Sequence, residues 1–536
     1  MTEGFISIPL VRRKKIMMRS LYSGVSGLKS HQTKMDVIGN NIANVNTIGF
    51  KSSSVNFADT FYQTVSSATG PDAAAGTAGT NAKQIGLGSV VASITCNVTE
   101  QGGTSSTNRA LDIAINGDAF LVVNSGGTTY FTKSGALNVD TNGTLYCTTN
   151  GATVMGWMAQ EAEDGSVSIS KDTVTDLTVM SAENMYYAPS ETSNITLTGN
   201  IDKTDPDLEV TDNTTATMDD GLARTFAFYD ELGQIFTAKM YVYSIAGSTS
   251  DSGTPLSNYA VTVGDVTDEN GNSLFVTKID NGDGTYSYAS TGVSVSLGGV
   301  EYTVDTVNDK TGAFTLAASA DPATLSFVAE TGEFSTVTEN DALGRLDTSI
   351  YAGNCMAFQV NTNGSTYIDN TFTSYDATTD SGGIEIDFSN LTQYSTSGVS
   401  NGSYTKGDSE GNGAGNTAGE LSGISIDDNG YIYGTYSNGS KKLLAQIAVA
   451  TFANPSGLES VGDSLFAQTL NSGTFDGVGE EISVSGSFTV GALEMSNVDL
   501  ATEFTNMITT QRGFQANSRI ITTSDSMLEE LVNLKR

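Results

Sequence analysis

Side chains that commonly carry out catalysis or bind metals are scarce in this chain. His31 is the one histidine among 536 residues, so a histidine-based metal site is excluded and any catalysis would depend on carboxylates, lysines or tyrosines. We expect His31 to be a polar residue on a helix surface. The cysteines, Cys96, Cys147 and Cys355, are odd in number and far apart, which predicts free thiols and neither a disulfide framework nor a zinc knuckle.

The acidic residues do not form a recognisable active or metal site. Adjacent pairs such as Glu480-Glu481 and Glu529-Glu530 point apart on a strand or a helix, which makes them poor glycosidase pairs. The turn at residues 280–284 resembles half of a calcium loop but lacks its later ligands. The glycine-rich residues 411–415 lie in no strand–turn–helix context for phosphate binding. We therefore predict no enzyme activity, no cofactor and no metal.

Composition excludes further classes of function. With 25 basic and 60 acidic side chains the formal charge is -35, which argues against nucleic-acid binding and against an anionic membrane surface. The acidic excess lies in the middle of the chain, whereas residues 1–51 carry eight basic and two acidic side chains. No apolar run reaches the length of a membrane span. We expect residues 1–16 to be a mis-assigned translation start or a basic tail, and export to proceed without a cleaved leader.

Both ends of the chain predict an amphipathic helix. Apolar residues alternate in steps of four and three, which is the spacing of a coiled-coil seam. The N-terminal stripe contains Leu21, Val25, Leu28, Met35 and Ile42, and the C-terminal stripe contains Leu500, Phe504, Met507, Phe514, Ile521, Leu528 and Val532. Polar residues interrupt these stripes at Gln32, Gln511, Ser518 and Asp525. Ser496 with Asp499 predicts a capping box at the start of the second helix. Each stripe needs a partner, so the ends predict assembly.

Between the helices the sequence predicts β-hairpins. Asn-Gly and Asp-Gly pairs recur between runs rich in Thr, Val, Tyr and Phe, and such pairs favour tight hairpin turns. The predicted fold is mainly β with α-helical termini, in which paired coiled-coil-like helices carry nested, discontinuous β domains. The expected divisions are residues 17–48 with 497–536 as the helical inner-tube domain, 49–95 as a connecting segment, 96–180 with 419–496 as an inner β domain, 181–241 with 349–418 as a middle β domain and 242–348 as an outer insertion.

Several segments resemble the axial proteins of the bacterial flagellum, namely the rod, hook and hook-associated proteins. The segment from Asn40 to Lys51, NNIANVNTIGFK, is similar to the signature of that family, as are residues 496–500 and 511–517 near the other end. The signature positions are Asn40, Asn41, Asn44, Asn46, Gly49, Phe50, Asn497, Asp499, Gln511 and Arg512. Residues 228–233, 391–394 and 434–458 resemble hook proteins in particular.

This resemblance implies a structural subunit of a flexible, hollow tube that acts as a universal joint and passes torque from the rod to the filament. Its implied partners are further copies of itself, distal rod, hook cap and hook–filament junction proteins and the export apparatus, outside the cell after export. Some relatives cross-link subunits through a cysteine and a lysine, for which Cys147, Cys96 and Lys133 are the candidates. The alternatives are a distal-rod-type axial subunit, a secreted β-rich adhesin or glycan-binding module on an axial scaffold, and an enzyme embedded in the insertion.

Overall fold

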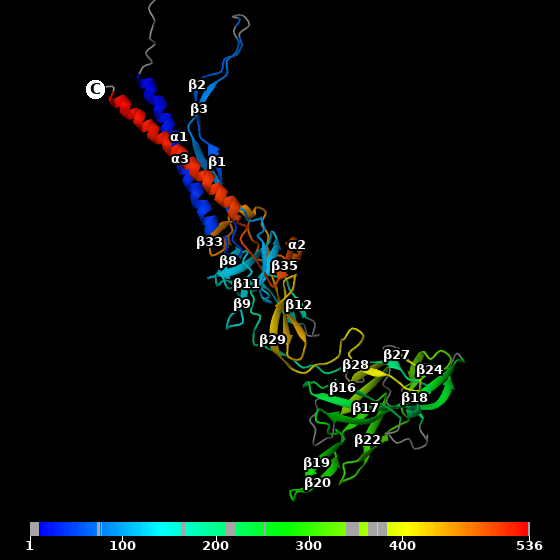
Figure 1. The fold of residues 1–536 in the computed structure, drawn as a ribbon. Coiled ribbons are helices and arrows are strands. Elements are labelled where there is room, and N and C mark those ends of the chain that lie inside the picture. The colour runs from blue at the N-terminus through cyan, green and yellow to red at the C-terminus, as the bar shows by residue number, and fades with distance from the viewer. Residues whose placement is uncertain are drawn as a thin grey trace, which may run out of the picture. The chain divides into compact units, whose positions relative to one another are not determined.

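The chain folds into two compact units (Figure 1). The computed structural model describes residues 10–71, 76, 78–161, 167–209, 221–250, 253–338, 353–362, 372 and 383–533, with side chains from residue 19 onward except at 531. Unit 1 comprises residues 1–185, 422–435 and 441–536, and unit 2 comprises residues 186–421 and 436–440. Strands make up most of the structure and a long helix lies at each end of the described chain, which confirms the predicted fold class.

The two terminal helices, α1 (Leu10–Ala43) and α3 (Leu500–Asn533), lie side by side in unit 1 (Figure 1). α1 already begins inside the segment 1–16, of which residues 1–9 lie outside the described residues. α3 begins with Asp499 as its N-cap: its carboxylate accepts from the amide of Ala501 at 2.9 Å and from the hydroxyl of Thr502 at 2.6 Å. The predicted capping box was therefore placed three residues too early, since Asp499 is the cap itself.

A central antiparallel sheet forms the β part of unit 1. Its strands lie in the order β30 (Tyr431–Tyr436), β31 (Lys441–Ile447), β11 (Thr153–Glu161), β7 (Phe120–Ser125), β8 (Thr128–Thr132), β34 (Leu465–Ala467) and β33 (Glu459–Gly462). β9 (Leu137–Val139), β10 (Leu145–Cys147), β12 (Val167–Ile169), β13 (Thr175–Asp176) and β32 (Val449–Ala450) attach to it. Its two faces carry two apolar clusters, one around Leu121 and Ile447 and the other around Phe120 and Trp157.

Four two-stranded ribbons complete unit 1, and two of them join early to late parts of the chain. The ribbons are β1 (Ser53–Asp59) with β4 (Ser89–Cys96), β2 (Tyr62–Ser66) with β3 (Lys83–Gly86), β5 (Thr104–Ser106) with β36 (Ala492–Glu494), and β6 (Ile113–Gly117) with β35 (Gly486–Val490). Short helical turns lie at α2 (Ile482–Ser485) and η3 (Pro455–Gly457). The last two ribbons fix the C-terminal segment beside the start of the β domain before α3 begins.

Unit 2 contains two main sheets around one core. The first has the order β23 (Phe314–Ala318), β22 (Val300–Val307), β21 (Ser294–Leu297), β26 (Cys355–Asn361), β27 (Ile384–Thr392), β15 (Asn194–Asn200) and β28 (Ser403–Lys406). The second has the order β16 (Leu222–Tyr229), β17 (Ile235–Thr249), β18 (Pro255–Asp268), β24 (Thr324–Val328) and β25 (Phe334–Thr338). β19 (Val276–Asp280) pairs with β20 (Tyr286–Ser290), β14 (Tyr186–Tyr187) pairs with the start of β29 (Gly419–Ile426), and η1 spans Pro206–Leu208.

The sheets of unit 2 do not follow the predicted division at residues 242 and 348. β17 runs through residue 242 without a break, and β21 from the expected insertion pairs with β26 from the expected middle domain. One apolar cluster contains residues from all three segments, for example Phe228, Val263 and Phe358. Continuous hydrophobic alternation and long-range pairing leave no local sign in the sequence at which one domain could be separated from the other.

A recurring turn explains why the Asn-Gly pairs make hairpins. In the turns that begin at Asp140, Asp268, Asp408 and Asp427, one carboxylate oxygen accepts from the backbone amides two and four residues later. The glycine at the fourth position has a φ between 80° and 88° in each of them. Glycine adopts this left-handed conformation without steric cost. The acidic turns are therefore structural devices of the hairpins.

Candidate functional site

The two terminal helices pack against each other through small and polar residues. The Ser20 and Ser524 hydroxyls lie 3.5 Å apart, and the Asn41 amide donates to Glu503 Oε1 at 3.0 Å, so the helices are antiparallel. A Cβ atom added at Gly27 would lie 2.8 Å from Asn517 Nδ2, and one added at Gly24 would lie 3.3 Å from Ile521 Cγ1. These glycines allow the helix backbones to approach closely, which a larger side chain would prevent.

This intramolecular seam is offset from the predicted apolar stripe of α1 but shares Ile521 with that of α3, and both stripes remain partly exposed. On α1, Val25 is 49% exposed, and on α3 Phe504 and Val532 are 50% and 65% exposed. Leu21, Leu28, Met35, Ile42, Met507, Phe514, Ile521 and Leu528 are half-buried, and Leu500 is exposed. The polar interruptions Gln32, Gln511 and Asp525 are exposed, and Ser518 is half-buried. One subunit therefore leaves much of both stripes free for other contacts.

Two asparagines of the signature connect the base of the helices to the β domain. The Asn41 side chain accepts from the amide of Ser53 at 3.0 Å and donates to the carbonyl of the same residue at 2.9 Å. Asn497 accepts from the amide of Ser52 at 2.7 Å and donates to the carbonyls of Asn97 and Glu100. The amide side chain of asparagine carries a carbonyl acceptor and an NH2 donor on the same carbon. It can therefore bridge two backbone segments that run past each other.

A buried ion pair lies beside these asparagines. Lys51 Nζ is 2.8 Å from Glu494 Oε1, with side chains 1% and 3% exposed. Lys51 also donates to the carbonyl of Glu100 at 2.7 Å, and Glu494 accepts from the amide of Gly102 at 3.0 Å. The partners lie 443 positions apart in the sequence. Removing one member of such a pair leaves the other charge buried without compensation, which typically costs about 3–5 kcal/mol.

We define the junction as Asn41, Lys51, Ser52, Ser53, Glu494, Asn497 and Glu503. The resemblance pointed to Asn41 and Asn497, but it did not indicate that Asn41 would contact Glu503 or that Lys51 would pair with Glu494. The sequence feature that could have indicated a buried, paired Glu494 is its position as an acidic residue within an otherwise apolar segment, Gly491-Ala492-Leu493-Glu494-Met495. The junction fixes the N-terminal segment, the C-terminal segment and the first strands of the β domain at one place.

Gly49 explains another part of the signature. Its φ is 66°, and an added Cβ would lie 2.9 Å from the amide nitrogen of Ser134. Its amide donates to the carbonyl of Glu494 at 2.9 Å. A side chain here would both strain the backbone and displace the segment that carries Lys51, so this position requires glycine for two separate reasons.

The remaining signature residues lie at the end of α1 and on the surface of α3. The Asn44 side chain donates to Asn40 Oδ1 and accepts from the hydroxyl of Thr47, which closes the turn after the helix. Asn46 is exposed and Phe50 is half-buried. Gln511 and Arg512 are exposed on α3. In a single subunit these last two residues have no role in packing the protein core.

The cross-link candidates lie within unit 1 near the junction. Cys147 is fully buried, and its sulfur lies 3.0 Å from the hydroxyl of Thr149. Lys133 is 1% exposed and donates to the carbonyl of Gly117 at 2.8 Å; burial and the nearby Lys51 charge lower its pKa to about 8. Cys96 is half-buried and donates to the carbonyl of Lys51 at 3.6 Å, and burial raises the pKa of its thiol.

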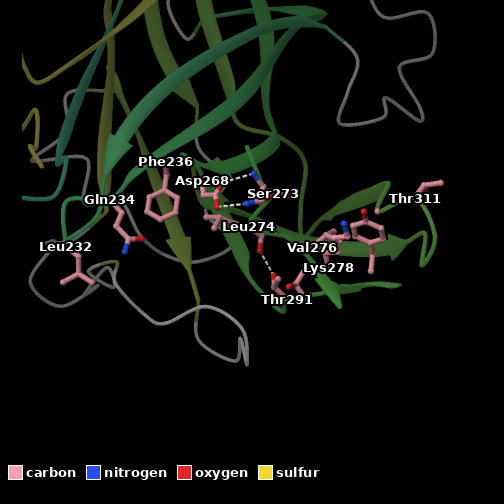
Figure 2. Close-up of a pocket in the computed structure, with 14 residues that line it drawn as sticks. Leu232, Gln234, Phe236, Asp268, Ser273, Leu274, Val276, Lys278, Thr291 and Thr311 are labelled. Atoms are coloured by element: carbon pink, nitrogen blue, oxygen red, sulfur yellow. Dashed lines mark hydrogen bonds between the residues drawn. The ribbon is translucent and has the colours of Figure 1, made fainter. Parts of the chain in front are cut away.

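A cleft of about 880 Å³ lies in unit 2 (Figure 2). Its polar side chains already bond to the protein. Asp268 accepts from Asn272, Ser273 donates to Asp265 at 2.6 Å and Thr291 donates to the carbonyl of Leu274. In the described part of the chain no three His, Cys, Asp or Glu side chains gather as metal ligands. We therefore assign no ligand or reaction to this cleft.

Neither terminal helix, nor any other described helix, combines the length and the apolar content of a membrane span. Three family models match the chain. "Flagella basal body rod protein" matches residues 21–51, "Flagellar hook protein FlgE/F/G D1 domain" residues 114–182, and "Flagellar basal body rod FlgEFG protein C-terminal" residues 489–534. The first and third of these cover Asn41, Lys51, Glu494 and Asn497, and thus most of the junction.

Relatives match almost the whole chain. The flagellar hook protein FlgE of Borreliella burgdorferi is 37% identical over 97% of this chain and 100% of its own length. That of Treponema pallidum is 34% identical over the same shares. The flagellar basal-body rod protein FlgG of Bacillus subtilis is 52% identical, but over 24% of this chain and 48% of its own.

A crystal structure of the Helicobacter pylori hook protein FlgE2 aligns with 73% of this chain and 99% of its own, at 12% identity and a TM-score of 0.30, which is too low to support an argument about the fold. The hook relatives, in contrast, span both terminal helices and both units. The chain therefore belongs to the flagellar hook protein family, whose members are structural subunits of the hook and not enzymes.

Proposed function

We propose that copies of this chain polymerise through their terminal helices into a hollow, flexible tube that passes torque from the rod to the filament. The observation that carries the proposal is that α1 and α3 pack on each other through Ser20, Gly24, Gly27, Asn517 and Ser524, while their apolar stripes remain partly exposed. A helix pair that used its stripes internally would have little apolar surface left for neighbouring copies.

Burial of these stripes would contribute free energy to assembly. Complete burial of a Val, Leu, Ile, Phe or Met side chain contributes roughly 1.5–3 kcal/mol relative to leaving it in water. Val25, Phe504 and Val532 are each about half exposed or more, so each can still gain part of this energy. Several such contacts repeated around a helical array would stabilise a polymer although each contact is modest.

The junction gives the proposed tube a rigid connection between its helices and its β domains. Torque that enters through the helices has to reach the β domain through residues 44–53 and 494–499. The ion pair and the asparagine bridges cross-connect these two chain segments, so a load on one is shared with the other. Flexibility of the tube would then come from contacts between subunits, whose acidic surfaces offer many nearly equal arrangements.

Further partners follow from membership of the hook family and remain proposals. We propose contacts with distal rod, hook cap and hook–filament junction proteins and with the export apparatus, and a location outside the cell after export. Exposed Gln511 and Arg512 on α3 are available for contacts with neighbouring subunits.

A covalent cross-link between subunits through Cys147 or Cys96 and Lys133 also remains a proposal. Cys147 and Lys133 are both buried within one subunit, so such a bond would require this part of unit 1 to open during assembly. Boiling purified hooks in detergent tests the proposal: a ladder of oligomers that disappears in the Cys147→Ser variant supports it, and complete dissociation to monomers excludes it.

Electron microscopy of cells that lack the gene tests the proposed function. We expect basal bodies with intact rods but no hooks, and filament-bearing hooks in the mutant cells would contradict the proposal. A sharper test uses Phe504→Ser, which removes an exposed apolar side chain from the stripe, with Thr505→Ser as the matched change at the exposed polar position next to it on the same helix. We expect short or absent hooks for the first variant and normal hooks for the second.

A further inference from the structure

His31 lies in the seam between the two terminal helices. The ring contacts α3, because a Cβ atom added at Gly513 would lie 2.7 Å from both its Cε1 and Nε2 atoms. Nδ1 is buried, and among the residues that the structure describes it has no hydrogen-bond partner. From the sequence we expected His31 to be a polar residue on a helix surface, whereas its ring lies against α3.

In the described part of the chain, the charged side chain that acts on His31 is a cation. On its own helix the charged neighbour is Lys34, which repels a protonated ring. From β1 the Phe57 ring meets the imidazole edge to face, with centroids 5.8 Å apart, and Lys34 Nζ already lies 5.7 Å over that same phenyl ring. α3 presents Gly513, with the uncharged Thr510 and Asn517 about one turn to either side. A proton on His31 would therefore place a second cation in a confined, uncompensated position.

Burial, with a further contribution from the Lys34 charge, lowers the pKa of His31 below its ordinary value of 6.5. The sign of the linkage follows from this direction. When the folded pKa is lower than the unfolded one, the paired state binds fewer protons than the separated state, and its stability falls as the pH drops from about 6.5 through the folded value. Above that range the ring is neutral in both states and the full pairing energy is present.

We propose that His31 is a proton-sensitive switch for the pairing of α1 with α3, which holds the helices together at neutral pH and loosens them in mild acid. The chain has one histidine, and no other side-chain type has an unperturbed pKa between pH 5 and 8. The switch acts inside each subunit, so it would operate in an isolated chain with paired helices as well as in a polymer.

Hooks purified from cells grown with ¹⁵N,¹³C-histidine allow a direct test, because solid-state NMR would then report one imidazole. We expect a protonation midpoint below pH 6.5. Hydrogen exchange of α1 and α3 amides, corrected for the intrinsic pH dependence of exchange, should accelerate over the same range, by about tenfold for each unit by which that midpoint lies below 6.5. A midpoint at or above 6.5 would overturn the proposal.

Two variants distinguish protonation of His31 from other effects of acid on the pairing of α1 with α3. His31→Gln keeps a polar side chain that cannot be protonated, so the acceleration of exchange in acid should be lost. Thr509→His adds an imidazole at an exposed position of α3 outside the stripe and should leave the wild-type exchange profile unchanged. If His31→Gln hooks loosen in acid as the wild type does, the proposal is wrong. If that variant does not assemble, the NMR midpoint of the wild type decides alone.

Discussion

In unit 1 the junction connects residues 41–53 to residues 494–503 through a buried cation and anion, whereas in unit 2 a single carboxylate connects two distant loops. Asp202 is fully buried and accepts from the amides of Thr396, Ser397 and Gly398 at 2.7–2.8 Å and from that of Thr204 at 2.9 Å. Asp205 adds a bond from the amide of Ser400. Both regions hold together chain segments that lie far apart in the sequence, but they do so by opposite means.

The junction and the Asp202 loop should therefore lose stability under different conditions. The junction balances one full charge against another, so removing either partner leaves a charge buried. The Asp202 loop balances one charge against backbone dipoles, which cannot be removed by mutation but lose their acceptor when the carboxylate is protonated. Hydrogen bonds from the backbone, with that of Thr204 the largest contribution, hold the pKa of Asp202 well below its usual range. Unit 1 should be sensitive to substitution and unit 2 to acid.

The largest effect is expected for Glu494→Gln, which leaves the Lys51 charge buried. We expect unit 1 to lose about 3–5 kcal/mol of unfolding free energy. Trp157, the one tryptophan, is 3% exposed in the core of unit 1, so its fluorescence during denaturant unfolding reports on this unit alone. Glu161→Gln is the matched control, since its partner Lys442 is near the surface, and it should cost at most about 1 kcal/mol. Equal losses for the two variants would refute the assigned role of the buried pair.

Asp202→Asn should change how unit 2 responds to acid. A carboxylate with a lowered folded pKa contributes stability that is present above its unfolded pKa and is lost as the pH falls towards the folded value. The variant should lose stability at pH 7 and show a flatter profile below about pH 4. Hydrogen exchange of β17 and β18 peptides between pH 7 and pH 3 measures this. Asp280→Asn, whose exposed carboxylate accepts from the amide of Gly282 in its own turn, should retain the wild-type profile.

A smaller effect is expected for Gly49→Ala, with Gly151→Ala as its control. Both glycines have a φ near 70°, but the added Cβ meets the Ser134 backbone at position 49 and nothing within 4 Å at position 151. The control should lose roughly 1–2 kcal/mol from backbone strain alone, and Gly49→Ala more than that. Tryptophan fluorescence measures both. If the two losses are the same, the close approach of Gly49 to residues 133–134 contributes nothing.

The smallest effect concerns Lys133. Its pKa of about 8 lies below the ordinary value of 10.5, so the folded state binds fewer protons than the unfolded state between these values and unit 1 should gain stability as the pH rises through them. Lys133→Met should abolish this gain, which we expect to be about 2 kcal/mol between pH 7.5 and pH 10. The wild type and the variant are compared by tryptophan fluorescence at pH 7.5 and pH 10. The same change with pH in both proteins would rule out Lys133 as its source.

The comparison of the two regions also shows what the sequence could and could not predict. The terminal helices follow from the spacing of residues such as Leu21, Val25 and Leu28, and the hairpins follow from turns such as Asp427-Asp428-Asn429-Gly430. The helix–helix seam could not be found in this way, because close packing by Gly24 and Gly27 leaves no apolar pattern. The expected stripes identified surfaces of the helices but not the face that pairs within the subunit.

Long-range polar contacts could not be predicted from the sequence either. Nothing local in the sequence indicates that Lys51 meets Glu494, or that Asp202 meets the amides of residues 396–398. The resemblance to a known family identified Asn41 and Asn497, but their partners depend on which backbone segments pass beside them in the folded chain. The division of the β region failed to match the sheets of unit 2 for the same reason, because pairing such as β21 with β26 is decided by the fold as a whole.

A cryo-electron microscopy structure of purified native hooks tests the central claim most directly, because it locates both faces of the terminal helices in the assembled state. We predict that Gly24, Gly27, His31 and Asn517 remain in contact within each subunit, while Val25, Phe504 and Val532 are buried against neighbouring copies. Helices whose apolar stripes face open solvent in the tube, or whose pairing within the subunit is through the stripes, would contradict it.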